Sequence, residues 1–244
     1  MKIQITNKNH FINKFLIPLN KLNENLVLKI SKDKIISTTS TNDGVLILHC
    51  TYNTNNNIDN DFNLNVPNIS KLIKVLQCVA SDSIDLVYDK NCLQYTSADI
   101  KFKYHLLEDG ILSSPAISID KIKKLEFNTH LKIDFNSISN LIKGSTFATD
   151  TNKVYFFTKD NILYGELTDR QKHNVDSYCQ VITTNITGDE IVKPLPLDFE
   201  VIRLISTIRF DTVDLHIAQD NNVYMFDIND ESSKLNYIAS GFTK

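Results

Sequence analysis

The sequence predicts an α+β protein built from two similar halves, each with antiparallel sheets and two helices. Most of the chain divides into short segments rich in β-branched and aromatic residues, separated by two- or three-residue polar breaks. Four segments instead place apolar residues at helical spacing. The order helix, strands, helix, strands occurs twice, with helices beginning near residues 6, 67, 135 and 197. The nearly equal separation within each pair indicates an internal duplication.

Short strands account for most of the first half. The breaks Lys32-Asp33 and Asp89-Lys90 are typical of tight hairpins and predict an antiparallel meander. The segment IKFKYHL alternates apolar and polar residues, as a half-buried strand does. The asparagine-rich segment 53–61 is expected to be a solvated loop. The expected strands are 25–31, 34–40, 44–52, 83–88, 91–96 and 100–106.

The second half repeats this style. Polar breaks at 159–161 and 220–222 again separate apolar segments of strand length. The expected strands are 131–133, 153–158, 162–167, 177–184, 213–218, 223–228 and 234–239.

Four helices are expected at 7–16, 67–80, 135–149 and 197–210. Pro18 is expected to end the first helix, and Pro67 to lie in the first turn of the second. Asp134 is a suitable N-cap for the third helix. The fourth follows Pro194 and Pro196.

A segment of mixed character separates the halves. Gly110 and Pro115 interrupt regular structure in 107–125, yet aliphatic residues recur there, which indicates that something apolar packs against the segment. We therefore expect a first domain at 1–108, a connector at 109–125 and a second domain at 126–244.

The charge distribution points to the helices. A net charge of −3 and a pI near 6.1 argue, for the whole chain, against nucleic-acid binding. The four expected helices, however, carry seven basic residues and two acidic ones, while the rest carries 19 basic and 27 acidic residues. Polar, weakly basic helix faces suit phosphate contacts without base readout, although lysines on a helix can also be simply solvated. The basic residues are Lys8, Lys14, Lys71, Lys74, Lys143, Arg203 and Arg209.

Sequence motifs for catalysis are missing. The six glycines are too far apart for a phosphate-binding loop, and neither GxSxG nor HExxH occurs. The four cysteines and six histidines lack zinc-ligand spacing. Aspartate pairs such as Asp85 with Asp89 are more typical of turns than of metal sites. We expect no catalytic residue, no cofactor and no metal ion.

The chain is also expected to be a cytoplasmic protein. It contains no run of about 18 apolar residues, and the polar N-terminus lacks the apolar core of a signal peptide. Hence we expect no membrane association, and the host cytoplasm as its location if the protein is viral.

Four segments give the chain a resemblance to a known family. They are DFNLNVPNISKLIKVLQ (61–77), IKFKYHLLED (100–109), IDFNSISNLIKG (133–144) and KLNYIASGF (234–242). In order and character they resemble the sliding clamps, or processivity factors, of DNA replication, in particular the tailed-phage branch, related in fold to proliferating-cell nuclear antigen. The resemblance covers essentially the whole chain at low identity and includes no short diagnostic motif.

This resemblance implies a function and an assembly. Two clamp domains per chain would close head to tail into a homotrimeric ring, with sheets outside and two helices per domain lining the hole. The ring would encircle double-stranded DNA without sequence preference and make a replicative DNA polymerase processive. The basic residues above would face DNA. A clamp loader is a further expected partner.

The resemblance also implies two protein-binding surfaces. The strand 100–106 would pair with the strand 177–184 of the next subunit, and a pocket beneath the connector would bind apolar anchors of the polymerase and the loader. The interface residues would be Lys101, Phe102, Lys103, Tyr104, Tyr178, Gln180 and Val181. The pocket residues would be Val45, Leu46, Ile111, Leu112, Ile117, Ile238, Ala239 and Phe242, which ordinary packing between domains would also explain.

Two other classes of function remain open from the residues alone. The main alternative is a non-enzymatic, β-rich structural or adaptor protein of a virus. The other is a small-molecule enzyme whose site assembles only in the folded chain.

Overall fold

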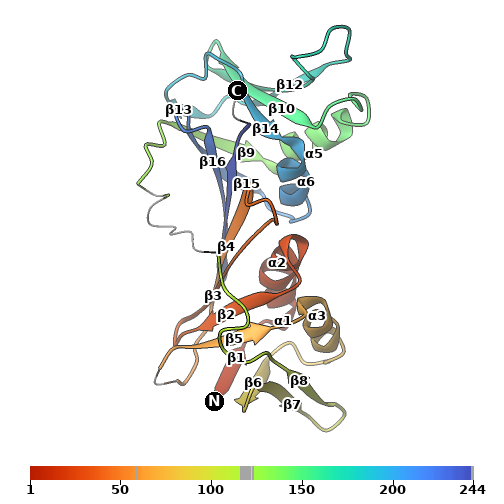
Figure 1. The fold of residues 1–244 in the computed structure, drawn as a ribbon, viewed down its shortest axis with the longest axis vertical. Coiled ribbons are helices and arrows are strands. Elements are labelled where there is room, and N and C mark those ends of the chain that lie inside the picture. The colour runs from red at the N-terminus through yellow and green to blue at the C-terminus, as the bar shows by residue number, and fades with distance from the viewer. Residues whose placement is uncertain (59, 116–121, 123, 243–244) are drawn as a thin grey trace. The chain divides into compact units, whose positions relative to one another are not determined.

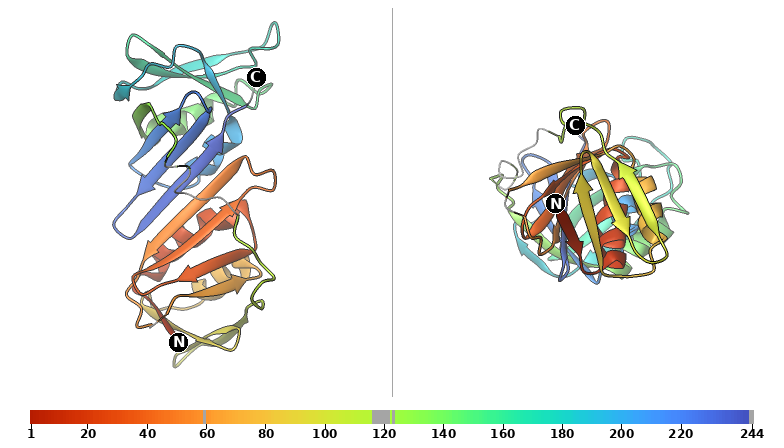
Figure 2. Two further views of the ribbon diagram at one scale, coloured as in Figure 1. Left: turned by 60° about the vertical axis from the view of Figure 1, so that its left-hand side comes forward. Right: turned by 90° about the horizontal axis from the view of Figure 1, so that it is seen from below.

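The computed structural model describes residues 1–58, 60–115, 122 and 124–242. The chain divides into two compact units. Unit 1 comprises Met1–Asn42, Ile47–Ala116 and Asp230–Leu235, and unit 2 comprises Asp43–Leu46, Ile117–Asn229 and Asn236–Lys244. In each unit the helices lie against one side of the strands (Figure 1 and Figure 2).

Unit 1 contains two groups of antiparallel strands. One sheet has the order β1-β6-β7-β8. In the other group β5 pairs with β2, β2 with β3, and β3 with β4. The elements are β1 (Lys2–Ile5), α1 (Lys8–Phe11), the π-helix η1 (Ile12–Leu16), α2 (Ile17–Leu22), β2 (Leu26–Ile30), β3 (Lys34–Ser40), β4 (Leu46–Asn53), β5 (Phe62–Val66), α3 (Ile69–Gln77), β6 (Ile84–Asp89), β7 (Cys92–Thr96) and β8 (Lys101–His105).

Unit 2 repeats this construction. One sheet has the order β12-β11-β10-β14, and in the other group β13, β9, β15 and β16 pair in that order. The elements are β9 (Thr129–Asp134), α5 (Phe135–Gly144), β10 (Lys153–Lys159), β11 (Ile162–Leu167), β12 (Tyr178–Thr183), β13 (Ile186–Gly188), β14 (Leu195–Asp198), α6 (Phe199–Ser206), β15 (Thr212–Ala218), β16 (Val223–Asn229) and β17 (Ser233–Ser240). The greater part of β17, from Asn236, belongs to unit 2.

The predicted duplication is confirmed in the order of elements and in strand pairing. Apart from the short β13, each unit runs strand, helix, three strands, strand, helix, three strands. The pairing β5-β2-β3-β4 of unit 1 corresponds to β14-β10-β11-β12 of unit 2. Likewise, β1-β6-β7 corresponds to β9-β15-β16. The predicted α+β class with antiparallel sheets is therefore correct.

The first helix differs from its prediction at Pro18. Instead of ending there, the helical segment continues through α2 to Leu22. Pro18 lies in the first turn of α2, directly after the π-helical turn Ile12–Leu16. A proline in a first turn has no N–H to leave unpaired, and a π-turn is one of the known ways in which a helix accommodates a kink. The prediction placed the helix correctly and its end wrongly.

The other helices are shorter than predicted. Asn68 caps α3 by accepting a hydrogen bond from the Lys71 N–H at 2.9 Å, so Pro67 precedes the helix and does not lie in its first turn. Asp134 caps α5 as predicted, accepting from the Ser137 N–H at 2.7 Å. The cap of α6 is Asp198, because the residues before it pair with β10 as the strand β14.

The asparagine-rich segment 53–61 is only partly solvated. Asn56 is buried, with 1% of its surface exposed. Its Oδ1 accepts from the Gln4 N–H at 2.9 Å, and its Nδ2 donates to the Ser31 carbonyl at 2.8 Å. The side chain thus ties the segment to β1 and to the β2–β3 turn. The composition of the segment gave no sign that one asparagine among many would be internal.

Two further findings complete the fold. The list of expected strands lacked β1, β5, β13 and β14, which are short or lie beside a proline, so their periodicity is weak. In the described part of the chain, no helix has the length and apolar character needed to span a membrane.

Candidate nucleic-acid and partner-binding surfaces

Helix α3 separates an apolar side from a basic side. Ile69, Leu72, Ile73 and Leu76 are buried. Lys71 and Lys74 are exposed on the opposite side. No carboxylate lies in the first turn of this helix, so no acid within that turn neutralises the lysines. The helix therefore presents the polar, basic face that the sequence predicts.

Lys8 does not belong to that kind of surface. Only 3% of its surface is exposed, and its ammonium group donates to the Val79 carbonyl. Its backbone N–H also donates to the Asp82 carbonyl at 2.7 Å. Lys8 thus fastens the start of α1 to the chain after α3. The sequence-based expectation that Lys8 faces DNA disagrees with this burial, whereas Lys14 on η1 remains partly exposed.

The helices of unit 2 repeat the pattern with one modification. Lys143 on α5 and Arg203 on α6 are both exposed, and Arg209 is exposed beyond the end of α6. Arg203 pairs with Glu200 at 3.3 Å, and its guanidinium lies 4.9 Å from the centre of the Phe199 ring. These contacts orient Arg203 along the helix and reduce its local positive field, because Glu200 carries the opposite charge.

Each unit has a sheet edge that no described strand covers. The strand β8 ends the sheet β1-β6-β7-β8, and β12 ends the sheet β12-β11-β10-β14. An uncovered edge presents unpaired N–H and C=O groups that can pair with another chain. Lys101 and Lys103 on β8 are exposed, as is Val181 on β12, at 49%.

Side chains on both edge strands contact the helices of their own unit. The Tyr104 hydroxyl donates to the Asn68 carbonyl at 2.7 Å. Burial raises the pKa of that hydroxyl, and the Asn68 N–H, which donates to the hydroxyl oxygen at 3.1 Å, lowers it. Tyr178 packs on Gly144, where a Cβ would lie 2.3 Å from the ring. Gln180 donates to the Ser137 carbonyl at 2.8 Å. These three predicted interface side chains therefore support the edges from within their own unit.

The exposed side of β12 also carries a free thiol. Cys179 and Cys78 are exposed and Cys50 and Cys92 are buried, and all four are free. Partial burial raises the pKa of the Cys179 thiol, Glu166 raises it further, and Arg170 opposes these effects. Cys179 is thus a thiol, not a thiolate, at neutral pH.

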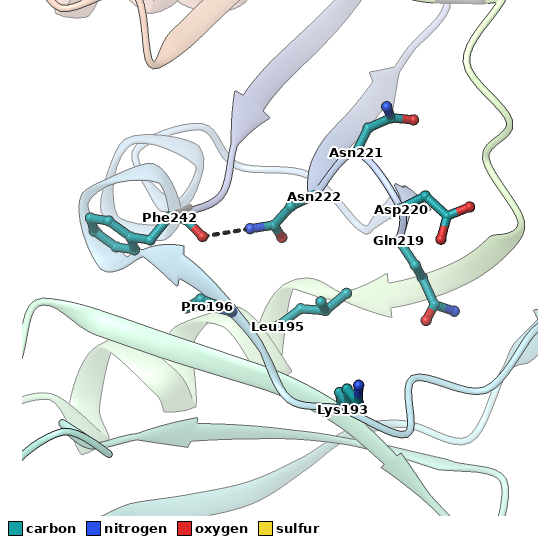
Figure 3. A pocket seen from close by; sticks show the side chains of 8 residues that line it. All are labelled: Lys193, Leu195, Pro196, Gln219, Asp220, Asn221, Asn222 and Phe242. Carbon is teal, nitrogen blue, oxygen red and sulfur yellow. Dashed lines mark hydrogen bonds between the residues drawn. The ribbon is translucent and has the colours of Figure 1, made fainter. Parts of the chain in front are cut away.

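The C-terminal tail borders a cavity of about 450 Å³ in unit 2 (Figure 3). The tail is held in place by hydrogen bonds: the Gly241 N–H donates to the Asn222 carbonyl at 2.7 Å, and the Asn222 amide donates to the Phe242 carbonyl at 2.9 Å. The Lys153 ammonium lies 5.1 Å from the centre of the Phe242 ring. The cavity is lined by Lys193, Leu195, Pro196, Gln219, Asp220, Asn221, Asn222 and Phe242.

Two features make this cavity suitable for a polar, extended ligand. The Asn222 Oδ1 atom is buried and has no hydrogen-bond partner among the described residues. A buried acceptor of this kind favours a ligand that donates an N–H. Gly241 leaves room beside it, because a Cβ at that position would lie 2.4 Å from the Asn222 amide and would displace that side chain. Of the predicted pocket residues that the structure describes, only Phe242 lines this cavity.

The other predicted pocket residues lie elsewhere. Ile238, Ala239 and Leu46 are buried and Val45 is partly exposed. Ile111 and Leu112 line a separate hollow of about 560 Å³ within unit 1, beside β2 and β3. Ile117 lies outside the described residues.

The sequence predicts the β15–β16 turn as the polar break at 220–222, but it does not indicate that this turn borders a cavity, and the prediction lacked β14. Asn222 has a φ of 50°. Asparagine is one of the few residues that tolerate this region, so the run Asp220-Asn221-Asn222 indicates a tight turn. Nothing in the sequence places the turn beside the C-terminus.

The described residues contain no cluster of three or more histidine, cysteine, aspartate or glutamate side chains arranged to hold a metal ion. Of the aspartates considered earlier, Asp85 forms an ion pair with Lys2 at 2.9 Å. That contact is a structural one between β6 and β1.

Comparisons with known proteins agree on the fold. No family model matches the sequence, and no curated protein matches it. Among solved structures, PCNA of A. fulgidus bound to the C-terminal region of FEN-1 matches with a TM-score of 0.79 at 14% identity, covering 100% of this chain and 98% of that one. PCNA of Thermococcus kodakaraensis matches with a TM-score of 0.79 at 12% identity, with 99% of both chains covered.

A third structure extends the comparison. The PCNA2–PCNA3 complex of Sulfolobus tokodaii matches with a TM-score of 0.76 at 14% identity, covering 99% of both chains. At such low identity the agreement concerns the fold, and it spans both duplicated units. The chain therefore has the two-domain α+β fold of the PCNA-like sliding clamps.

Proposed function

We propose that this chain is one subunit of a sliding clamp, a ring of three copies that encircles duplex DNA and makes a replicative DNA polymerase processive. The observation that carries this proposal is the pair of uncovered sheet edges, β8 in unit 1 and β12 in unit 2. One chain with two different free edges can join copies head to tail, and such contacts close into a ring when the rotation permits.

In the proposed ring, β8 of one copy pairs with β12 of the next. Both strands are short, at five and six residues, which limits uncontrolled pairing by a free edge. Three copies are proposed because the resemblance to clamps implies six similar domains in a closed ring. Unit boundaries near the predicted 1–108 and 126–244, with a connector at 109–125, remain part of this proposal.

The proposed DNA contact is weak and independent of sequence. It uses Lys14, Lys71, Lys74, Lys143, Arg203 and Arg209, and it leaves out the buried Lys8. Contacts from such side chains to phosphates position a protein on DNA without reading bases. A net charge of −3 for the whole chain is more consistent with sliding along DNA than with tight binding, because an acidic exterior repels DNA.

The proposed partner site is the cavity beside the tail, formed by Phe242 and the β15–β16 turn. Its polymerase and clamp-loader ligands would be extended tails that place apolar anchors against Phe242 and Pro196. The free Asn222 Oδ1 favours a backbone or amide N–H from the same ligand. The structure titled as PCNA bound to the C-terminal region of FEN-1 supports a peptide tail as the kind of ligand.

We propose that the protein is a scaffold and not an enzyme. Its partners, its cytoplasmic location and its place in the tailed-phage branch remain predictions from the sequence. The alternative of a β-rich viral structural or adaptor protein is less favoured, because it gives no reason for a duplicated unit with a free edge in each copy.

Sedimentation equilibrium over a wide range of concentrations tests the assembly. A subunit has a mass of 27.9 kDa, and the proposal expects the measured mass to approach three subunits as concentration rises. A strict monomer at the highest concentration would contradict the ring. A mass that grows without limit would indicate an open filament instead, which would also contradict it.

A further inference from the structure

Two histidines face each other across neighbouring strands of unit 2. His130 on β9 is the register partner of His216 on β15. Their Nδ1 atoms are 2.7 Å apart, and the rings meet edge to face with centroids 5.0 Å apart. Both residues alternate with buried neighbours along their strands, so they lie on the more exposed side of the sheet. The sliding-clamp proposal gives this pair no role.

A carboxylate lies near the His216 ring. Asp227 Oδ2 on β16 lies 3.8 Å from His216 Nε2. Asp227 is itself held by a hydrogen bond from the amide of Asn236, whose surface is only 2% exposed. An ordered carboxylate beside Nε2 favours the tautomer that carries its proton there, which leaves His216 Nδ1 with a lone pair. At 3.8 Å the contact is electrostatic, and it is longer than the hydrogen bond from a carboxylate that commonly orients a metal-binding histidine.

The surrounding charges also favour a cation. Asp214 is the register partner of both Lys132 and Asp227, so two carboxylates and one ammonium flank the histidine pair in the next row of the sheet. Phe127 packs edge-on against His216, with centroids 6.3 Å apart, and covers one side of that ring. His130 remains exposed, which gives an ion access from solvent.

We propose that His130 and His216 form a two-ligand site for a nitrogen-preferring transition-metal ion, positioned by Asp227. Copper and zinc are the ions best suited to imidazole ligands. Metal–nitrogen bonds of about 2.0–2.1 Å at a tetrahedral angle place two nitrogens about 3.4 Å apart, so the rings must separate by about 0.7 Å. Small rotations of the two side chains supply this change, since neither ring is fully enclosed.

Water or a ligand from outside the site completes the coordination, because the described residues supply no third histidine, cysteine or carboxylate in range. Binding is therefore reversible, and it displaces the proton shared between the two Nδ1 atoms. The affinity decreases as the pH is lowered, since both nitrogens must be unprotonated to bind the ion. The bound ion links β9 to β15 and stabilises unit 2.

The test measures Cu²⁺ binding to the full chain without a histidine tag. The background carries Cys78→Ser and Cys179→Ser, so that exposed thiols do not compete. Calorimetric titration is expected to give one saturable site, with an electron paramagnetic resonance spectrum that reports two nitrogen ligands. His130→Asn and His216→Gln are each expected to abolish this site, while the exposed His173→Asn serves as the matched control and leaves it intact.

Two further measurements separate binding from folding. Asp227→Asn is expected to weaken binding about tenfold without removing either ligand, as loss of an orienting carboxylate does. The thermal midpoint of the background protein should rise with Cu²⁺, and that of His130→Asn should not. An absence of saturable binding, or binding unchanged by His130→Asn, would overturn the proposal. Neither result bears on ring formation.

Discussion

Some residues in this protein make buried hydrogen bonds that their neighbours in the sequence do not make. Asn56 and Lys8 are buried polar residues in segments where adjacent residues are exposed. Each satisfies backbone groups from a distant element: Asn56 joins β1 to the β2–β3 turn, and Lys8 joins α1 to the chain after α3. Because a buried polar group without a partner is costly, these two residues should contribute more to stability than the polar composition of their segments indicates.

Asn56→Ala is expected to lower the free energy of unfolding by about 1–3 kcal/mol, because the Gln4 N–H and the Ser31 carbonyl lose their buried partner. Urea unfolding followed by circular dichroism measures the change. Asn57→Ala is the matched control, since Asn57 is exposed in the same segment. Equal effects of the two substitutions would show that the buried contacts of Asn56 contribute nothing.

Asp230 should make stability depend on pH. Burial raises the pKa of its carboxyl, but hydrogen bonds from Ser232 and Ser233 and the nearby His10 together lower it below the ordinary value. A carboxyl with a lowered folded-state pKa stabilises the fold above its unfolded-state value of about 3.9. That contribution disappears as the pH falls through the lower, folded-state value.

Asp230→Asn should therefore destabilise the protein at neutral pH and progressively less as the pH falls below about 4. Urea unfolding of both proteins at several pH values gives the comparison. A stability difference that is constant over this range would show that the ionised carboxylate of Asp230 has no special role.

At the scale of elements, the strands with a free edge and the basic helix faces carry the proposed function. The positions of β8, β12 and the four helical regions were largely predictable, because their apolar periodicity is clear. Most helix ends were not, because they depend on caps and on strand pairing: Asn68 ends the extended segment before α3, and β14 includes residues expected to begin α6. Pro18 was misread because a π-turn precedes it.

Val181→Lys on β12 should prevent assembly while leaving the subunit folded. Val181 is 49% exposed on the free edge, and a lysine there opposes pairing with the lysine-bearing β8 of another copy. Sedimentation is expected to give the mass of one subunit. Val192→Lys is the control, since Val192 is 77% exposed but lies outside the strands, and it should leave assembly unchanged. If the Val181→Lys variant assembles as the unmodified protein does, that result would contradict the proposed pairing through the β12 edge.

Reversing Lys71, Lys74, Arg203 and Arg209 to glutamate should abolish DNA binding without unfolding the protein, since all four side chains are exposed. Each lost phosphate contact is expected to reduce the salt dependence of binding by about one unit of slope. The control reverses Lys32, Lys90, Lys159 and Lys172, which are exposed outside the helices and give the same net charge. Equal losses in both variants would show that only total charge matters.

At the scale of the whole molecule, the duplication was predictable and the sites were only partly so. The order of helices and strands follows from local sequence patterns, and this order predicts the correct fold class. Sites depend on residues far apart in the chain: Phe242 meets the β15–β16 turn, and His130 meets His216. Periodicity contains no information about such long-range contacts, so the sequence does not predict which residues line the cavity together with Phe242.

The central claim is that the protein surrounds DNA, and a covalently closed ring tests it without any partner protein. Cys179 is exposed on β12, and Lys101, Lys103 and His105 are exposed on β8. In a Cys78→Ser background, each β8 position is changed in turn to cysteine, which samples the pairing register between copies. The protein is then oxidised in the presence of nicked circular plasmid.

At least one variant is predicted to form a disulfide-closed trimer that stays with the circular plasmid in high salt and is released when a restriction enzyme linearises the DNA. Release depends on linearisation only if the protein is linked topologically to the circle. Closed trimers that high salt removes from the intact circle, or retention that linearisation does not change, would contradict the account.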